Sequence, residues 1–272
     1  MTDLLPAWSE PFHDGQPAST TRLGLPGVTR AWAFGDGRGA GVRVAVIDSG
    51  IDAGHPLVGG VADAVAIGRD RDAPSGVRVI TGPHDDLYGH GTACAGIVRE
   101  LAPAVELVSV RVLAANLRGS AIAFAQGLEW CLDHGVHVVN LSLSTTNDDM
   151  APSFFELVDR AAQRGMTIVS AMNNERRRSI PSEFAGVLSV ACAPCADRET
   201  WRHRRGGPAE WGAAGIEVEV AWAGGATVVA TGNSFAAPVI TGHVARIIGA
   251  HPGIEPWQVR TVLAELAADA AA

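Results

Sequence analysis

The residues that suggest chemistry most strongly in this sequence are those that can activate a hydroxyl. A serine hydroxyl is a poor nucleophile near neutral pH, so it needs a base that takes its proton and an acceptor that orients the base. It also needs hydrogen-bond donors aimed at the oxyanion that forms. The chain offers an acid, Asp48, a base, His90, two adjacent amides, Asn173 and Asn174, and a hydroxyl, Ser234.

These candidates all lie where a strand is expected to end or a helix to begin. Asp48 closes an apolar run, His90 stands in Gly-His-Gly-Thr at 89–92, and both asparagines follow the apolar run at 167–171. Ser234 precedes a helical stretch whose Pro238 falls in the first turn, where a missing N–H costs least. In a parallel sheet such positions converge on one edge, and a helix N-terminus favours a developing negative charge.

The elements that must position these residues follow an alternating pattern. Short apolar runs predict strands at 42–47, 105–112, 136–143, 167–171, 187–192, 216–222 and 226–230. Helical patterns occupy 91–101, 120–134, 152–164, a long segment from Ser234, and 256–267. This alternation predicts a parallel sheet that helices cover on both faces. Residues 1–40, rich in Pro, Gly and Ser, predict an N-terminal arm with a short helix near 28–34, ahead of a single domain at 41–272.

The bulk composition narrows the function classes. The chain has 272 residues, 47% of them hydrophobic, and a net charge of −8, which argues mildly against nucleic acid as a partner. No apolar stretch approaches the roughly 18 residues that a membrane span requires, and no signal-peptide pattern leads the chain. We interpret the four cysteines as reduced thiols of a cytoplasmic protein. The oligomeric state stays open.

Three segments resemble, in order, the signature blocks of the subtilase family: 46–51, 89–92 and 232–238. The similarity covers about residues 28–265. It implies an α/β fold, the subtilisin-like, doubly wound, mostly parallel sheet with helices on both faces. It also implies a serine endopeptidase that works through an acyl-enzyme. In such an enzyme Ser234 would be the nucleophile, His90 the general base and acid, and Asp48 the group that orients His90, while Asn174 and the Ser234 amide would bind the oxyanion.

The resemblance also implies where a peptide or protein substrate would bind, and there the chain departs from the family. The implied substrate-binding residues are Leu117, Arg118, Gly119, Leu141, Ser142, Leu143, Ser144, Asn173 and Glu175. Ser144 and Thr145 replace a usual pair of glycines, and Leu117 and Arg118 interrupt a usually Gly-rich, substrate-pairing strand. Asn173 also replaces a glycine. These changes favour a narrow substrate range, such as the processing of precursor peptides or proteins.

No metal or cofactor is expected. The stretch 94–103 lacks the insert that binds calcium in familiar secreted members of the family. Cys192 and Cys195 have the spacing of half a redox or zinc site, but no second pair accompanies them. Cys94 follows His90 by four residues on one helical face, which favours a core thiol.

Other interpretations stay open beside the peptidase. The chain could be a catalytically idle subtilase-like module that binds peptides, or an esterase or transpeptidase that uses the same triad. The charged segments also disagree about substrate preference. Arginines at 176–178 and 202–205 suit an acidic peptide, whereas His84, Asp85, Asp86 and Glu175 suit a basic one.

Overall fold

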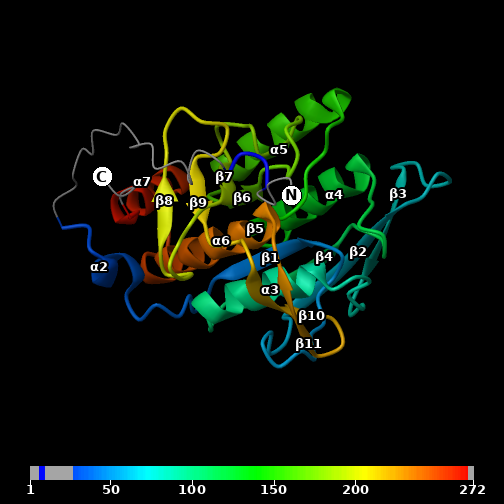
Figure 1. The fold of residues 1–272 in the computed structure, drawn as a ribbon. Helices are drawn as coiled ribbons and strands as arrows, with labels where there is room; N and C mark the ends of the chain where they lie inside the picture. The colour runs from blue at the N-terminus through cyan, green and yellow to red at the C-terminus, as the bar shows by residue number, and fades with distance from the viewer. Residues whose placement is uncertain (1–5, 10–26, 269–272) are drawn as a thin grey trace, which may run out of the picture.

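A computed structural model describes residues 6–9 and 27–268 and centres on one large, twisted sheet (Figure 1). Nine strands follow the order β3-β2-β4-β1-β5-β6-β7-β9-β8. Only the two edge pairs, β2 with β3 and β8 with β9, are antiparallel; the other neighbours run parallel. The strands are β1 (Arg43–Asp48), β2 (Asp63–Arg69), β3 (Val77–Thr81), β4 (Glu106–Arg111), β5 (Val138–Leu141), β6 (Thr167–Ala171), β7 (Leu188–Cys192), β8 (Trp201–His203) and β9 (Trp211–Ala213).

Helices cover both faces of this sheet, as the alternating pattern predicted (Figure 1). The central strand β1 shows why: Val44 and Val46 belong to one apolar cluster, and Ala45 and Ile47 to another on the opposite face. The first cluster packs under α2 (Arg30–Phe34), α3 (His90–Leu101), α6 (Asn233–Ala250) and α7 (Pro256–Leu266). The second packs under α4 (Ala121–Asp133) and α5 (Ala151–Gln163).

A separate antiparallel hairpin lies over α3. Its strands are β10 (Val218–Trp222) and β11 (Ala226–Ala230), and the turn between them carries Gly224 and Gly225 at positive φ. The hairpin approaches α3 closely, since a Cβ on Gly96 would lie 3.0 Å from the Ala221 Cβ. The hairpin leads directly into the segment that carries Ser234.

Most of the expected elements form within one or two residues of their predicted bounds. β6 and β11 agree at both ends, and α4 begins after Ser120, whose side chain accepts a hydrogen bond from the Ala123 N–H. Four strands were not predicted: β2, β3, β8 and β9. β8 and β9 have three residues each, and β3 is exposed along most of its length, so these three strands show no clear apolar period.

The predicted division into an arm and one domain stays a prediction. The arm's residues 1–5 and 10–26, and the tail 269–272, lie outside the described residues. The short helix expected near 28–34 forms as α2. Within the described part of the chain, no helix combines the length and the apolarity that crossing a bilayer demands.

Two adjacent phenylalanines of α5 test the packing of the core on the sheet face that α4 and α5 cover. Phe154 is fully buried, whereas Phe155 is 62% exposed and contacts only the edge of the Phe184 ring. We expect Phe154→Ala to lower the free energy of unfolding by about 3–5 kcal/mol, because it leaves a cavity in a packed core. Phe155→Ala should cost under about 1 kcal/mol. Chemical denaturation measures both, and equal losses would contradict the burial assigned to Phe154.

Candidate active site

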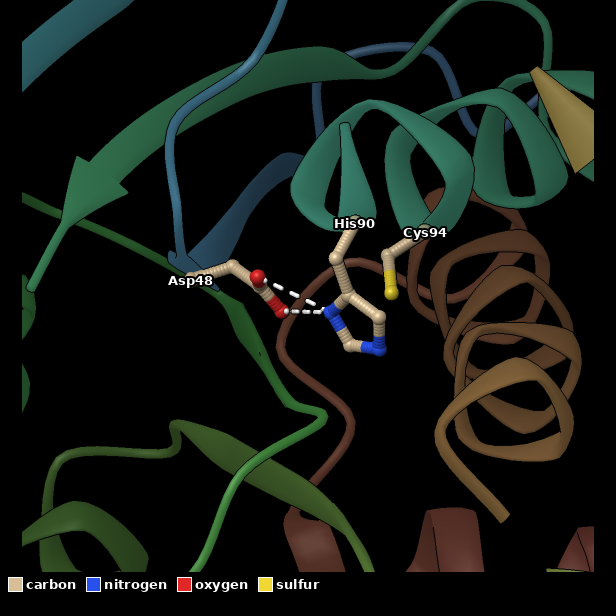
Figure 2. A group of neighbouring side chains, drawn as sticks. All are labelled: Asp48, His90 and Cys94. Atoms are coloured by element: carbon tan, nitrogen blue, oxygen red, sulfur yellow. Dashed lines mark hydrogen bonds and ion pairs between the residues drawn. The ribbon is translucent and has the colours of Figure 1, made fainter. Parts of the chain in front are cut away.

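The site is built around a buried contact between a strand end and a helix start. Asp48 is the last residue of β1 and is fully buried, and His90 is the first residue of α3 and is 9% exposed. The Nδ1 atom of His90 lies 2.8 Å from Oδ2 and 2.9 Å from Oδ1 of Asp48 (Figure 2). The Ser49 N–H donates a further hydrogen bond to Asp48 Oδ1 at 2.7 Å. The carboxylate therefore holds the imidazole by one nitrogen and leaves the other, Nε2, pointing away from it.

This contact requires two backbone segments to lie unusually close. A Cβ on Gly91 would lie only 2.0 Å from the carbonyl oxygen of Gly50, so no side chain fits there. Gly89, the N-cap of α3, has φ of 116°, a left-handed backbone that favours glycine. The glycines on either side of His90 thus let the helix start reach the end of β1.

Asp86, which we had considered only as a charge near the cleft, holds the loop before His90. Its carboxylate accepts hydrogen bonds from the N–H groups of Tyr88, Gly89 and Thr92, at 3.0, 2.8 and 2.9 Å. It also accepts from the hydroxyls of Ser49 at 2.8 Å and Thr92 at 2.6 Å. These partners lower its pKa against the opposing effect of burial. The spacing of an acid three residues before Gly-His-Gly-Thr was the signal that could have revealed this role.

The environment of His90 suits a base. Burial by itself lowers the pKa of the His90 imidazole. The charge of Asp48 and the hydrogen bond to Asp48 oppose this effect and raise the pKa, and Asp86 adds a smaller contribution in the same direction. The net effect is a pKa above the ordinary histidine value. A histidine in this position takes up a proton more readily than one in water does.

Ser234 lies in the first turn of α6, next to His90. The ring of the following residue, Phe235, lies 5.5 Å from the His90 ring. The Ser234 carbonyl accepts a hydrogen bond from Ser142 Oγ at 2.8 Å, which ties the helix start to the end of β5. Folding therefore brings the three predicted residues from β1, α3 and α6 into one place.

The serine and the histidine are not hydrogen-bonded to each other in this structure. The Ser234 hydroxyl donates instead to the Ser142 carbonyl at 3.3 Å, a long hydrogen bond. A serine hydroxyl moves by rotation about a single bond, and such contacts are often loose until a substrate is bound. The Asp48–His90 half of the predicted arrangement is thus assembled, whereas the Ser234 hydroxyl has a different hydrogen-bond partner.

The two candidate oxyanion donors have different partners. The Oδ1 of Asn173 accepts from the Glu175 N–H at 3.0 Å and so closes a local turn. The Oδ1 of Asn174 accepts from the Asn233 N–H at 2.9 Å, one residue before Ser234. Its Nδ2 lies 3.6 Å from where a Cβ of Gly232 would stand. Asn174 is therefore the amide held against the start of α6, with an N–H group left to donate.

The residues after β5 divide into core and surface. The side chain of Leu141 is fully buried, and the Ser142 hydroxyl accepts a hydrogen bond from Asn140 Nδ2 at 3.0 Å as well as contacting Ser234. Leu143 and Ser144 are partly exposed, and Thr145 pairs with Ile180 through two backbone hydrogen bonds. Of the predicted substrate-binding residues 141–144, the first two thus have side chains committed to the fold, and the last two reach the surface.

A hollow of about 800 Å³ lies beside the end of β1, where Asp48 stands, and some of the other predicted substrate-binding residues line it. Leu113 lines it, and its N–H donates to the Asp48 carbonyl at 3.1 Å. Arg118 and Gly119 also line it, and Leu117 lies in the adjoining turn at φ of 57°. Glu175 lies elsewhere, on the exposed loop after β6, where it pairs with Arg177.

Cys94 lies on α3 one turn after His90 (Figure 2). Its Sγ lies 3.2 Å from Ser142 Oγ and 3.6 Å from the Ser234 carbonyl. Burial raises the pKa of this thiol well above its usual value, so the group stays protonated and serves as packing beneath the site. Among residues 6–9 and 27–268, Asp48, His90 and Cys94 form the one group of three potential metal ligands within 4.8 Å of one another. Two of these residues form the Asp48–His90 contact, and the third packs beneath it.

The Cys192 and Cys195 pair has the surroundings of ordinary thiols. Both are free, and Cys192 is fully buried. Burial raises the pKa of Cys192 to about 12 and that of Cys195 to about 11. Neither thiol is activated as a nucleophile at neutral pH.

Comparison with known proteins agrees with this geometry. The model of the subtilase family matches residues 39–272. A thermostable alkaline protease of Halalkalibacterium halodurans is 32% identical over 234 residues, which cover 82% of this chain and 61% of that protein. Subtilisin BL of Lederbergia lenta is 30% identical over 238 residues, which cover 83% of this chain and 82% of that protein.

Solved structures show the same fold. Sphericase superposes with a TM-score of 0.71 at 23% identity, over 84% of this chain and 83% of its own. A cold-adapted subtilisin-like serine proteinase superposes with a TM-score of 0.67 at 24% identity, over 84% of this chain and 82% of its own. The match of the family model, the identity to these relatives and the shared sheet lead to one conclusion: this chain is a member of the subtilase family of serine peptidases.

Proposed function

We propose that this chain is an endopeptidase that cleaves peptide bonds through an acyl-enzyme formed on Ser234. The observation that carries the proposal is the buried Asp48–His90 contact beside the N-terminal turn of α6, where Ser234 stands. A buried carboxylate that fixes one imidazole nitrogen leaves the other ready to take a proton from a neighbouring hydroxyl. The relatives support the same reaction, because their names describe them as proteases and subtilisins.

Each step of the proposed reaction has a residue of this chain. The Ser234 Oγ attacks the scissile carbonyl carbon while His90 Nε2 takes its proton, and Asp48 stabilises the resulting imidazolium. The carbonyl oxygen becomes an oxyanion that accepts hydrogen bonds from Asn174 Nδ2 and the Ser234 N–H. His90 then protonates the departing amine, which leaves the acyl group on Ser234. Water, deprotonated by His90, releases this acyl group in the reverse of the same sequence.

The alternatives are an idle peptide-binding module and an esterase or transpeptidase that uses the same triad. A module without catalysis would need a defect at the site, but all four proposed catalytic side chains are present and each of them makes a hydrogen bond. Hydrolysis is favoured over transfer to an amine because the proposed oxyanion donor, Asn174, is exposed, so water can reach its side of the site.

The proposed substrates are a restricted set of precursor peptides or proteins with acidic residues near the cleaved bond. Four arginines line the hollow beside Asp48: Arg69, Arg78, Arg111 and Arg118. Asp70 pairs with Arg78, whereas no carboxylate in the described part of the chain pairs with the other three. Asp86, in the loop before His90, already accepts five hydrogen bonds from Ser49, Tyr88, Gly89 and Thr92. The unpaired charge around the hollow is therefore positive.

A fluorophosphonate probe tests the proposed nucleophile. The purified chain should gain the mass of one probe adduct, because an activated serine attacks phosphorus and loses the fluoride. Ser234→Ala should gain none. Intact-mass spectrometry measures both, and an unlabelled wild-type chain would indicate a module without catalysis.

The pH profile tests the assigned base. Only neutral His90 can accept the proton, so kcat/KM should fall as the pH drops through a His90 pKa that lies above the ordinary histidine value. Asp48→Asn removes the negative charge that raises this pKa, so the acid limb should move to lower pH. The same change should reduce kcat by about 10⁴-fold. An acid limb that stays in place in Asp48→Asn would show that another group governs it.

Matched peptides test the proposed preference for acidic residues. Peptides with Glu on the amino side of the cleaved bond should have a higher kcat/KM than the same peptides with Lys. Arg118→Ser should reduce this preference by about 2- to 5-fold, the effect of one exposed ion pair. Arg71→Ser provides the control, because Arg71 is exposed near the hollow without lining it. An equal effect of both substitutions would mean that general charge, and not the hollow, sets the preference.

A further inference from the structure

The N-terminal residues 6–9 form a small turn against the catalytic edge of the sheet, and we call this segment the strap. The N–H and the hydroxyl of Ser9 both donate to the Pro6 carbonyl, at 3.2 and 2.6 Å, which closes the turn. Pro6 and Ser9 are buried. Figure 1 shows the strap as a dark blue segment beside the start of α6. The strap is far from the start of α6 in the sequence, so only tertiary contacts hold the two together.

The strap bonds directly to two residues of the proposed oxyanion site. The Ala7 N–H donates to the backbone carbonyl of Asn174 at 2.7 Å. The Ala7 carbonyl in turn accepts a hydrogen bond from Asn233 Nδ2 at 2.9 Å. Ala7 thus joins the proposed oxyanion donor to the residue that precedes the proposed nucleophile.

Asn233 is the junction between these parts. Its side chain is fully buried; the Oδ1 accepts from the Cys192 N–H at 2.9 Å, and the Nδ2 reaches the Met172 carbonyl at 3.2 Å as well as Ala7. Its backbone N–H holds the Asn174 Oδ1 at 2.9 Å. An amide has two N–H groups and an acceptor, which match these three backbone partners. A threonine at this position would have one hydroxyl and could not make all three bonds.

Trp8 anchors the strap. Its ring packs against an apolar cluster of Met172, Ala191, Ala193 and Ala209. The guanidinium of Arg176 lies over the ring, 5.7 Å from its centroid. The loop at 174–178 is otherwise exposed, so the strap supplies packing at its first residues.

We propose that the strap and Asn233 are positioning elements for the Asn174 side chain. Asn174 is held at two points, its carbonyl by Ala7 and its Oδ1 by Asn233, and these contacts fix the direction in which Nδ2 donates. A donor fixed in advance stabilises the oxyanion without paying for reorganisation during the reaction. This role rests on the proposed peptidase function, since it concerns the transition state of that reaction.

The first experiment compares two tryptophan variants of the full chain. Trp8→Ala should reduce kcat per labelled active site by about 10- to 100-fold, because a small displacement of a catalytic group is costly. KM should change little, because the lost interaction acts in the transition state. Trp257→Ala is the matched control, since Trp257 is 67% exposed on α7, and it should leave kcat unchanged. An unchanged kcat in Trp8→Ala would overturn the proposal.

A double-mutant cycle separates positioning from general stability. Asn174→Ala should by itself reduce kcat by about 100- to 1,000-fold. If the strap acts through Asn174, adding Trp8→Ala to that variant should reduce kcat by less than about 2-fold more. The same Trp8→Ala loss in both backgrounds would overturn the proposal and leave the strap a structural role.

Hydrogen exchange provides a measurement that does not depend on turnover. In the Ser234→Ala background, Trp8→Ala should speed amide exchange in the peptide that covers residues 173–178, and Trp8→Phe should restore much of the protection. If Trp8→Ala does not fold, Ala7→Pro provides a second test. It removes the N–H that donates to Asn174 but keeps the Trp8 ring, and it should also speed exchange at residues 173–178. Unchanged exchange would overturn the strap's role even if the probe labels Ser234. A failure of labelling would instead refute the peptidase proposal alone.

Discussion

The arrangement of this molecule depends on one buried contact, that between the Asp48 carboxylate and the His90 ring. A fully buried carboxylate is costly unless a partner compensates for its lost hydration. The start of α3 must therefore approach the end of β1 so closely that Gly91 cannot carry a side chain. The loop before α3 is fixed in this approach by Asp86, whose carboxylate accepts hydrogen bonds from three N–H groups of the turn. The geometry of the proposed base follows from these contacts.

The rest of the site is added around this contact from more distant parts of the chain. α6 presents its first turn, with the positive end of its dipole, beside His90. Ser142 joins β5 to that turn, and Cys94 fills the space beneath as a protonated thiol. Asn233 extends the network to the N-terminal strap. The site is therefore a meeting point of separate elements, and each of them also has a structural function.

The predicted substrate-binding residues differ in how firmly the fold holds their side chains. Leu141 and Ser142 are held by the core, so of the predicted substrate-binding residues it is Leu143, Ser144 and the turn that carries Arg118 that remain accessible. The charged hollow beside Asp48 is the basis for the selectivity proposed above, because it favours one sign of charge over the other. An exposed ion pair contributes little binding energy, so the expected preference is graded.

The fold class, the order of the main elements and the contact between Asp48 and His90 could be predicted from the sequence alone. These follow from local signals: the run that ends at Asp48 is apolar throughout, and His90 and Ser234 lie in short motifs beside glycines. The sequence could not reveal the edge strands such as β3, whose residues are mostly exposed, or the orientation of the Ser234 hydroxyl toward Ser142. Only the tertiary structure decided that residues 6–9 reach Asn174, because hydrogen bonds between segments so far apart leave no periodic trace in the chain.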